Sequence, residues 1–268
     1  MTPINQKTGP KGLREDGGDC LPGGPRTPKN CRIYAIGDIH GRPDLLRRLH
    51  KRIIDDAGDS SDAGVGRKVC VYLGDYVDRG PDSFGVIDML VNDPLQGFEN
   101  VFLKGNHEDI MLTFLEDASD AAQWILNGGI ETLDSYGIGW SDLRPKIGNM
   151  DVIRQAFVDA LPESHRNFLS ALGLHHQEGD YLFVHAGVRP GRALEEQSAQ
   201  DLMWIREDFL DWDGDWRGLL GHFVVHGHSA GPVPDIRKNR VGLDTGAWRT
   251  NRLTALVLDG ASVRFLQT

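Results

Sequence analysis

Cysteine is scarce in this chain of 268 residues, and long hydrophobic runs are missing. The three cysteines, Cys20, Cys31 and Cys70, form no C-x-x-C pair, so we expect free thiols in a reducing compartment rather than a disulfide framework. No apolar run approaches the roughly 20 residues that a membrane-spanning helix needs. The first residues also lack the apolar core of a secretory signal. We therefore expect a cytoplasmic protein that does not enter the membrane.

Basic residues are also fewer than acidic ones. The chain has 29 Lys and Arg against 39 Asp and Glu, which gives a formal net charge of −10 at pH 7. Without a Lys/Arg-rich run, bulk electrostatic binding to nucleic acid or to an anionic membrane is not expected. A small phosphate-bearing substrate is still compatible, because a few local cations can override a global charge. Hydrophobic residues at 40% and charged residues at 25% are typical of a globular protein.

Large apolar residues are nearly missing from residues 1–30, which are dense in glycine and proline. Such a stretch buries too little surface to offset the entropy lost on ordering. We therefore predict a disordered N-terminal tail over residues 1–30, with a regulatory or docking segment as the alternative. The length of the chain suits one large α/β domain or two small ones, and we expect one domain over residues 31–268.

A short apolar run followed by a polar cluster recurs five times from residue 31 onward. Runs of this kind are typical of strands buried on both faces. Helical patterns after the first three runs indicate βαβ units and an α/β fold. The ligand crevice of such a sheet lies beyond the carboxyl ends of its strands, which is where all five polar clusters fall. The predicted strands are 32–36, 69–73, 101–104, 181–184 and 223–225.

The periodicity becomes helical between residues 110 and 175, which predicts a helical segment inserted into the domain. Glycine-rich breaks interrupt it at 127–129 and 137–139. After the last polar cluster, Asp259-Gly260 separates two further apolar runs and predicts a β-hairpin over 252–266. The helices expected in the insertion are 110–116, 121–127, 152–160 and 163–172.

Metal-ligating residue types directly follow each of the five predicted strands. Any one of them alone is better explained as a turn or a packed histidine, but five such clusters at strand ends are not independent turns. Three carboxylate or amide oxygens and three imidazoles suit manganese, iron or zinc, whereas an all-oxygen shell suits calcium. Six ligands fit two cations when one carboxylate bridges them, and the central Asp75 is the candidate bridge. The six are Asp38, His40, Asp75, Asn106, His185 and His228.

Seven short motifs carry these residues and their neighbours. GDIHG (37–41), GDYVDRG (74–80) and GNHED (105–109) resemble the metal-binding motifs of calcineurin-like metallophosphoesterases. The sequence Asp78-Arg79-Gly80 narrows the resemblance to the phosphoprotein phosphatase family. The later motifs resemble those of bacterial and bacteriophage lambda protein phosphatases: FVHAG (183–187), DLMWIRE (201–207), HGHS (226–229) and LDTGAW (243–248). The resemblance covers residues 31–268 and implies a four-layer sandwich, with two mixed β-sheets face to face and helices outside.

The resemblance also implies how the ligands divide between two cations. Manganese is the expected metal, with iron or zinc as alternatives. It implies one cation held by Asp38, His40 and Asp75. It implies a second cation held by Asp75 together with Asn106, His185 and His228. Of the two histidines in HGHS, the one after the glycine matches the ligand; His226 is then either a partner of the ligands or a packed residue at a strand end.

Roles in catalysis and substrate binding follow from the same resemblance. It makes His107 the general acid, with Asp78 accepting the other N–H of the imidazole and so fixing its tautomer. Arg79 and Arg206 become candidate phosphate ligands, because a guanidinium fork matches two phosphoryl oxygens. Arg206 could equally be a surface residue that covers an aromatic side chain. Lys104 departs from the arginine frequent at that position, and it keeps the charge but loses the fork.

Three acidic residues are open to a purely structural explanation. Glu108 and Asp109 are expected in the first turn of a helix, where carboxylates are favourable. Asp244 either accepts a hydrogen bond from a ligand histidine or forms an Asx turn.

The implied activity is metal-dependent hydrolysis of phosphomonoesters by in-line attack of a hydroxide that bridges two cations, without a phosphoenzyme. The favoured substrate is phosphoserine or phosphothreonine in proteins, and a small phosphorylated molecule is the other kind of partner. The alternative is a symmetrical dinucleoside polyphosphate hydrolase acting on diadenosine tetraphosphate. Trp140, Trp204 or Trp248 placed to stack on adenine would favour this alternative. A non-catalytic binding scaffold is a third reading, and the intact ligand set argues against it.

Overall fold

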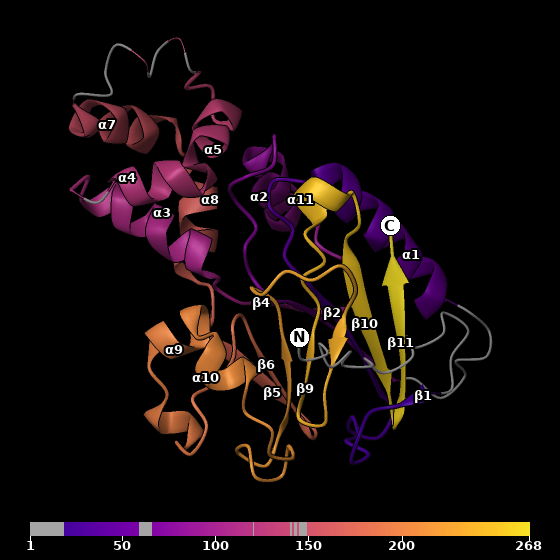
Figure 1. Ribbon diagram of the computed structural model, residues 1–268. Helices are drawn as coiled ribbons and strands as arrows, with labels where there is room; N and C mark the ends of the chain where they lie inside the picture. The colour runs from indigo at the N-terminus through magenta and orange to yellow at the C-terminus, as the bar shows by residue number, and fades with distance from the viewer. Residues whose placement is uncertain (1–18, 59–65, 120, 140, 142–143, 145–148) are drawn as a thin grey trace, which may run out of the picture.

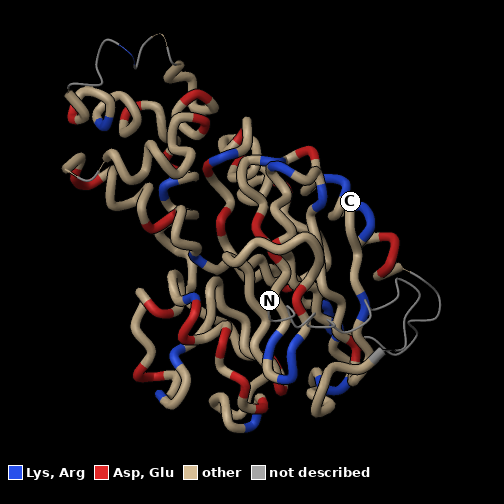
Figure 2. Tube along the Cα trace, viewed as in Figure 1, with Lys and Arg blue, Asp and Glu red and all other residues tan. Residues whose placement is uncertain are grey.

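Two mixed β-sheets lie face to face, with helices on their outer sides (Figure 1). The computed structural model describes residues 19–58, 66–119, 121–139, 141, 144 and 149–268. The expected α/β sandwich of four layers is confirmed. Among the described residues no helix is both long and apolar enough to cross a membrane. Acidic and basic residues are interspersed along the chain rather than separated into two faces (Figure 2).

The six-stranded sheet contains three of the predicted strands and the predicted hairpin. Its order is β1-β11-β10-β2-β3-β4. β2, β3 and β4 run parallel, whereas β10 and β11 are antiparallel and meet at a turn where Gly260 adopts a φ of +57°. The strands are β1 (Asp19–Cys20), β2 (Cys31–Ile36), β3 (Arg67–Tyr72), β4 (Glu99–Phe102), β10 (Thr254–Asp259) and β11 (Ser262–Gln267).

The five-stranded sheet has the order β5-β6-β7-β9-β8. Its parallel centre, β6, β7 and β9, is covered on both faces, and two antiparallel strands close its edges. The sequence predicts β6 and β7 but not the three others, because those are short or carry polar residues at half-exposed positions. The strands are β5 (His175–Glu178), β6 (Tyr181–Val184), β7 (Phe223–His226), β8 (Asp235–Ile236) and β9 (Arg240–Gly242).

The helices include those that the sequence predicts in the insertion. α1 begins at Pro43, a residue that suits a first helical position, and turns Leu45, Leu49 and Ile53 toward the sheet. The helical elements are α1 (Pro43–Ala57), α2 (Ser83–Asn92), α3 (Asn106–Glu116), α4 (Ala121–Trp124), the π-helix η2 (Ile125–Gly129), α5 (Ile130–Ser135), α7 (Met150–Ala160), α8 (Glu163–Ser170), the 3₁₀ turn η4 (Leu194–Glu196), α9 (Ala199–Trp204), α10 (Glu207–Leu210) and α11 (Ala247–Thr250).

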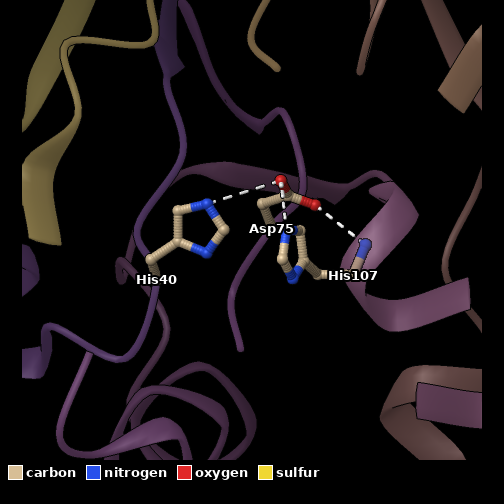
Figure 3. A group of neighbouring side chains, drawn as sticks. All are labelled: His40, Asp75 and His107. Carbon is tan, nitrogen blue, oxygen red and sulfur yellow. Dashed lines mark hydrogen bonds and ion pairs between the residues drawn. The ribbon is translucent and has the colours of Figure 1, made fainter. Parts of the chain in front are cut away.

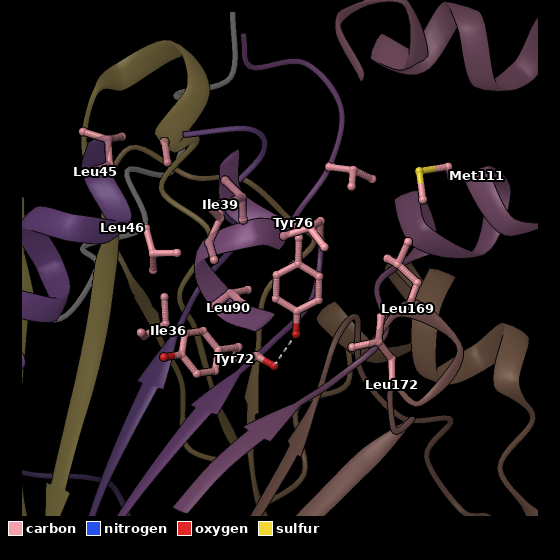
Figure 4. Close-up of a cluster of buried hydrophobic side chains, with 14 of the residues drawn as sticks. Ile36, Ile39, Leu45, Leu46, Tyr72, Tyr76, Leu90, Met111, Leu169 and Leu172 are labelled. Atoms are coloured by element: carbon pink, nitrogen blue, oxygen red, sulfur yellow. Dashed lines mark hydrogen bonds between the residues drawn. The ribbon is translucent and has the colours of Figure 1, made fainter. Parts of the chain in front are cut away.

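Alternation along the central strands separates the hydrophobic core into three parts. In β2, Ile33 and Ala35 face the second sheet, and Tyr34 and Ile36 face α1 and α2 on the other side. The helix-side core continues from these helices into α3 and α8, so it joins the helical insertion to the sheet (Figure 4). The third part packs the outer face of the five-stranded sheet against α9 and α10, where Phe209 is fully buried.

The segment before β2 departs from the predicted tail. β1 pairs with β11, and Leu21 is only 4% exposed. The hydroxyl of Thr27 accepts the N–H of Gly260 at 2.9 Å, and the backbone N–H of Thr27 donates to the Gly260 carbonyl at 3.0 Å. These partners come from the C-terminal hairpin, so the local composition could not reveal them. The rest of the predicted tail, residues 1–18, lies outside the described residues.

Candidate active site

The predicted ligands occupy the loops that follow β2, β3, β4, β6 and β7, and these loops meet at one edge of the two sheets. Several of the loops are bent into left-handed backbone conformations. Among the described residues, eight that are not glycine have a positive φ, and five of these are predicted site residues. Such conformations are costly, and proteins keep them mainly at functional sites. The five are His40, Asp75, Asp78, Arg79 and His228, with φ between +47° and +70°.

Asp75 lies at the centre of the site, as Figure 3 shows. One carboxylate oxygen lies 3.5 Å from Nε2 of His40, and the other lies 3.4 Å from Nε2 of His185. The second oxygen also accepts the backbone N–H of His107 at 3.1 Å. Burial works to raise the pKa of Asp75, but His185 and His107 outweigh it and hold that pKa well below its usual range. The two oxygens therefore face two different groups of side chains, as a bridging carboxylate must.

Backbone carbonyls fix the two imidazoles that face Asp75. Nδ1 of His40 lies 2.8 Å from the carbonyl of Val77, and Nδ1 of His185 lies 2.9 Å from the carbonyl of Leu73. A carbonyl can only accept, so in both rings Nδ1 carries a proton and Nε2 is the nitrogen that faces Asp75. This is the arrangement that metal-binding histidines usually have.

Asn106 joins the second group of predicted ligands. Its side-chain oxygen lies 3.0 Å from Nε2 of His185 and 2.8 Å from Nδ1 of His228. The other ring nitrogen of His228, Nε2, is buried without a hydrogen-bond partner among the described residues. Burial works to lower the pKa of His185, but Asp75 raises it to about 10. Asn106, His185 and His228 thus converge on the side of Asp75 opposite His40.

Asp38 is oriented differently from the other predicted ligands. Its two oxygens accept the backbone N–H of His228 at 3.1 and 3.0 Å, and it belongs to neither of the two compact ligand groups found among the described residues. Burial raises its pKa, and the nearby carboxylate of Asp244 adds to the effect. Asp244 accepts the N–H of Gly246 at 2.8 Å, which is the Asx turn that the sequence left open.

The neighbouring histidine of the HGHS motif is packed rather than turned to the ligands. His226 ends β7, and its ring lies edge-on against Phe209 with 5.3 Å between ring centroids. Burial lowers its pKa to about 3. Of the two alternatives left open for His226, this geometry favours the packed residue at a strand end.

His107 forms a close pair with Asp78. Nδ1 of His107 lies 2.7 Å from Oδ2 of Asp78, and its Nε2 is buried, 3.9 Å from Asp75, with no hydrogen-bond partner among the described residues. Because an ionised carboxylate only accepts, Asp78 sets the proton on Nδ1 and leaves Nε2 facing the centre. Burial works to lower the pKa of His107, but Asp75 and Asp78 outweigh it and raise that pKa.

Sequence reasoning missed the two residues that hold Asp78. The hydroxyl of Thr132 donates to Oδ1 of Asp78 at 2.7 Å, and the indole N–H of Trp124 donates to both oxygens at 3.1 and 3.2 Å. Both belong to the helical insertion, and all three side chains are fully buried. Trp124 falls in the predicted helix 121–127 and Thr132 in none of the predicted elements, and no local signal marks either side chain as a partner of Asp78.

Glu108 does more than its predicted place in the first turn of α3 suggests. Its buried carboxylate accepts the backbone N–H groups of Gly105 at 2.9 Å, Asp75 at 2.9 Å and Tyr76 at 2.7 Å. The bond to Gly105 satisfies the backbone N–H of the N-cap residue of α3, and the other two fix the loop after β3. Burial raises the pKa of Glu108 to about 7, with Asp75 adding to the effect.

The three candidate phosphate ligands lie at different distances from the centre. Nη1 of Arg79 reaches within 3.3 Å of Nε2 of His40. Arg206 is exposed before α10; burial lowers the pKa of His228 to about 2, and the charge of Arg206 adds to that effect. Nζ of Lys104 lies 3.9 Å from Asp109 at the start of α3. Arg79 is therefore the best placed of the three, and Lys104 is turned toward a carboxylate.

Two cavities adjoin the site. One, of about 400 Å³, is lined by Asp109, Asp117 and Trp204, whose ring centroid lies 6.4 Å from that of His228. The other, of about 360 Å³, is lined by Arg79 and Trp248. Two of the tryptophans considered for stacking therefore line cavities next to the site. Trp140, the third, lies outside the described residues.

The donor set fits divalent cations. Burial lowers the pKa of His40 to about 3, and that of His228 to about 2, so both imidazoles are neutral near pH 7 and can offer a lone pair. Nε2 of His228 is buried without a hydrogen-bond partner among the described residues, and Asp75 turns its two oxygens toward two groups of imidazoles, so both are placed to bind a cation. Mixed nitrogen and oxygen ligands suit manganese, iron or zinc.

Comparisons with known proteins agree with this site. The family model described as calcineurin-like phosphoesterase matches residues 31–245. The chain is 27% identical over 227 residues to serine/threonine-protein phosphatase 2 of Escherichia coli, covering 83% of this chain and 90% of that protein. It is 23% identical over 240 residues to the asymmetrical bis(5'-nucleosyl)-tetraphosphatase PrpE of Oceanobacillus iheyensis, covering 84% of this chain and 87% of that protein.

A solved structure shows the same fold. The protein serine/threonine phosphatase of Saccharomyces cerevisiae matches with a TM-score of 0.50 at 15% identity, covering 89% of this chain and 80% of that one. The family model spans most of the chain, and the strand-end loops carry the motifs from which the sequence predicts this family. The chain belongs to the calcineurin-like phosphoesterase family.

Proposed function

We propose that this hydrolase removes phosphate from phosphoserine and phosphothreonine in proteins. The observation that carries the proposal is the pair formed by His107 and Asp78. Nδ1 of His107 is committed to Asp78 at 2.7 Å, and its Nε2 is the unpartnered atom that faces the centre. A serine or threonine alkoxide is a poor leaving group that needs a proton, whereas the phosphate leaving groups of a polyphosphate need one much less.

The proposed ligand assignment follows the two sides of Asp75. Asp38 and His40 would hold one cation with Asp75; Asn106, His185 and His228 would hold the other, again with Asp75. When bound, such a pair supplies a hydroxide near neutral pH and neutralises charge on the phosphoryl oxygens. Asp38 accepts the single backbone N–H of His228 with its two oxygens, and the remaining lone pairs of the carboxylate stay free for a cation.

The protein's own groups position the phosphate and deliver the proton. Arg79 would hold phosphoryl oxygens from the side of His40, and Arg206 would approach from the side of His228. His107 would protonate the departing oxygen from Nε2, while Asp78 keeps the ring oriented and stabilises its charged form. Glu108 would act as a positioning residue, since it ties the Asp75 loop to the start of α3.

Charge at the two cavities supports a single phosphate group over a polyphosphate chain. Asp109 and Asp117 line one cavity. Glu131 lines the other, together with the guanidinium of Arg79. A tetraphosphate would carry several negative charges past these carboxylates. The alternative, hydrolysis of diadenosine tetraphosphate, is favoured by a different observation: Trp204 and Trp248 line the two cavities and offer faces for adenine.

We also propose a cytoplasmic location. Cys20, Cys31 and Cys70 are all free thiols, and two of them are buried in the sheet region. Free buried thiols are typical of reducing compartments.

Side-by-side turnover of a phosphopeptide panel and diadenosine tetraphosphate, with manganese and with a chelator, tests the proposal. We expect kcat/KM at least tenfold higher on phosphoserine and phosphothreonine peptides, and no activity with the chelator. The Asp75→Asn variant, purified in parallel, controls for contaminating phosphatases. A higher kcat/KM on diadenosine tetraphosphate would establish the alternative. No turnover of either substrate or of an aryl phosphate would point to a scaffold.

A further inference from the structure

Two exposed hydrophobic side chains gather at one cavity beside the site. The described residues include five exposed large hydrophobics, and two of them line the cavity next to Arg79. Leu126 is 85% exposed and Trp248 is 38% exposed. Exposed apolar groups that share one hollow mark a binding surface more often than isolated ones do.

The cavity is joined directly to the phosphate-binding end of the site. Arg79 forms part of its lining, and the same guanidinium reaches to 3.3 Å from Nε2 of His40. A group in the cavity therefore sits one side chain away from a phosphate held by Arg79. That is the place for the part of a substrate that lies next to its phosphorylated residue.

An unusual turn builds one wall of the cavity. The glycine-rich break at 127–129 kinks the chain within η2, where Gly128 adopts a non-helical φ of +104°. The carbonyl of Gly128 accepts the backbone N–H of Arg79 at 3.3 Å, and a Cβ on Gly128 would collide with that same backbone. Here the turn lies against Arg79 and sends Leu126 out of the helical core to the cavity.

The opposite wall comes from the end of the LDTGAW motif. Trp248 lies in the first turn of α11, and Nη1 of Arg42 donates to the carbonyls of Ala247 at 3.3 Å and Trp248 at 3.5 Å. The guanidinium of Arg249 lies 6.0 Å from the centre of the Trp248 ring. The ring is thus exposed on a backbone that Arg42 holds, so little order is lost when a ligand packs on it.

We propose that this cavity, lined by Leu126 and Trp248, binds an apolar side chain of the substrate next to the phosphorylated serine or threonine. The aliphatic residues Ile125 and Ile130 complete its apolar lining, and a volume of about 360 Å³ has room for a leucine or phenylalanine side chain. The carboxylate of Glu131 lines the same cavity, so an uncharged group fits better than a nucleotide with its phosphate chain. The inference rests on the proposed function and adds a sequence preference to it.

Matched phosphoserine peptides test this preference. Each pair is identical except for leucine or serine at one position within two residues of the phosphoserine. For the unaltered protein we expect kcat/KM about tenfold higher with leucine at one of these positions. Leu126→Ser and Trp248→Ala should each bring that ratio to within about twofold of one. Ile54→Ser is the matched control, because Ile54 is 53% exposed on α1, outside this cavity, and its variant should keep both the activity and the ratio.

Each remaining outcome overturns the inference in a recognisable way. Equal kcat/KM within every pair, or an unchanged ratio in both variants, would show that no apolar side chain binds here while leaving the phosphatase proposal intact. Peptides that are not hydrolysed at all would remove the proposed function and this inference together. A fall in diadenosine tetraphosphate turnover in both variants, with the peptide ratio unchanged, would make the occupant a nucleobase. Thermal unfolding of each variant checks that it is folded.

Discussion

The loops at the strand ends and the helical insertion hold their site residues by different means. The loops use the backbone: carbonyls of Val77 and Leu73 fix His40 and His185, and left-handed turns aim the side chains. The insertion uses buried side chains, since Thr132 and Trp124 reach across to Asp78. The loops thus assemble the centre on the rigid sheets, whereas the insertion acts on it through the pair of Asp78 and His107.

Because of this difference, mutations in the two regions should have different effects on metal content and activity. A change in the loops should remove cations and activity together, because the ligands are themselves loop residues. A change in the insertion should leave the cations bound and alter the proton transfer that depends on Asp78. Metal content measured beside turnover therefore distinguishes the two regions.

The largest effect is expected from Asp75→Asn, which keeps the size of the side chain but removes the shared charge. Both cations should be lost together. Turnover should then fall on the order of 10³-fold or more, because losing both cations costs more than removing one hydrogen-bond donor from an active site. Elemental analysis checks this against Asp38→Asn and His228→Ala, each of which should lose mainly one cation. Two tightly held ions in Asp75→Asn would contradict the bridging role.

His107→Asn should keep both cations but lose general acid catalysis, which typically contributes about 10²–10⁴-fold. The loss should be greatest on phosphoserine, whose alkoxide needs the proton, and smaller on an aryl phosphate. Steady-state kinetics on the two substrates, with metal content as a reference, measure the difference. An equal loss on both substrates would assign His107 some other role.

Thr132→Val tests the contribution of the insertion. The variant removes the hydroxyl that donates to Asp78 but keeps the shape, so His107 is held less firmly. We expect kcat on phosphoserine to fall about tenfold and the alkaline limb of the pH profile, where His107 loses its proton, to move, with KM and metal content unchanged. Ser135→Ala is the matched control, since Ser135 bonds to the carbonyl of Thr132 and the N–H of Phe84 instead. Equal losses in the two variants would indicate a stability effect alone.

The smallest effect is expected at Lys104, on the border of the two regions. Its ammonium lies 3.9 Å from Asp109, so its contact with phosphate depends on release from that carboxylate. Lys104→Ala should raise KM by at most tenfold, which corresponds to about 1.4 kcal/mol, with metal content unchanged. Lys104→Arg should be tolerated or lower KM, and Lys51→Ala on α1 provides a distant control. Unchanged kinetics in Lys104→Ala would place Lys104 outside the site.

The sequence predicts the strands of this fold where they are long and buried. β2, β3, β6 and β7 are apolar runs ending in a polar cluster, and both features are local. β5 and β9 could not be predicted, because β5 alternates polar residues at a sheet edge and β9 is only three residues long. Their pairing comes from neighbours distant in the chain, as does the packing of residues 19–30 on the hairpin.

The site divides in the same way. The convergence of His40 and Asp75 could be predicted, because β2 and β3 are parallel neighbours whose ends meet at one edge of a sheet. His185 follows β6 in the other sheet, so only the resemblance of its motif grouped it with them. The contacts of Trp124 and Thr132 with Asp78 could not, since they depend on how a helix of the insertion is rotated against the sheet. Motif position alone suggested a pairing of Asp78 with His107, and the structure has these side chains 2.7 Å apart.

The left-handed backbone at five site residues bears on how this protein can be made to withstand heat. A residue with a Cβ in that conformation costs about 1–2 kcal/mol, whereas glycine adopts it freely. Selection for thermal stability alone would therefore favour glycine at His40, Asp75, Asp78, Arg79 and His228. Those substitutions would delete the side chains on which the chemistry is proposed to depend, so an engineering campaign on this fold gains most by leaving these turns unoptimised.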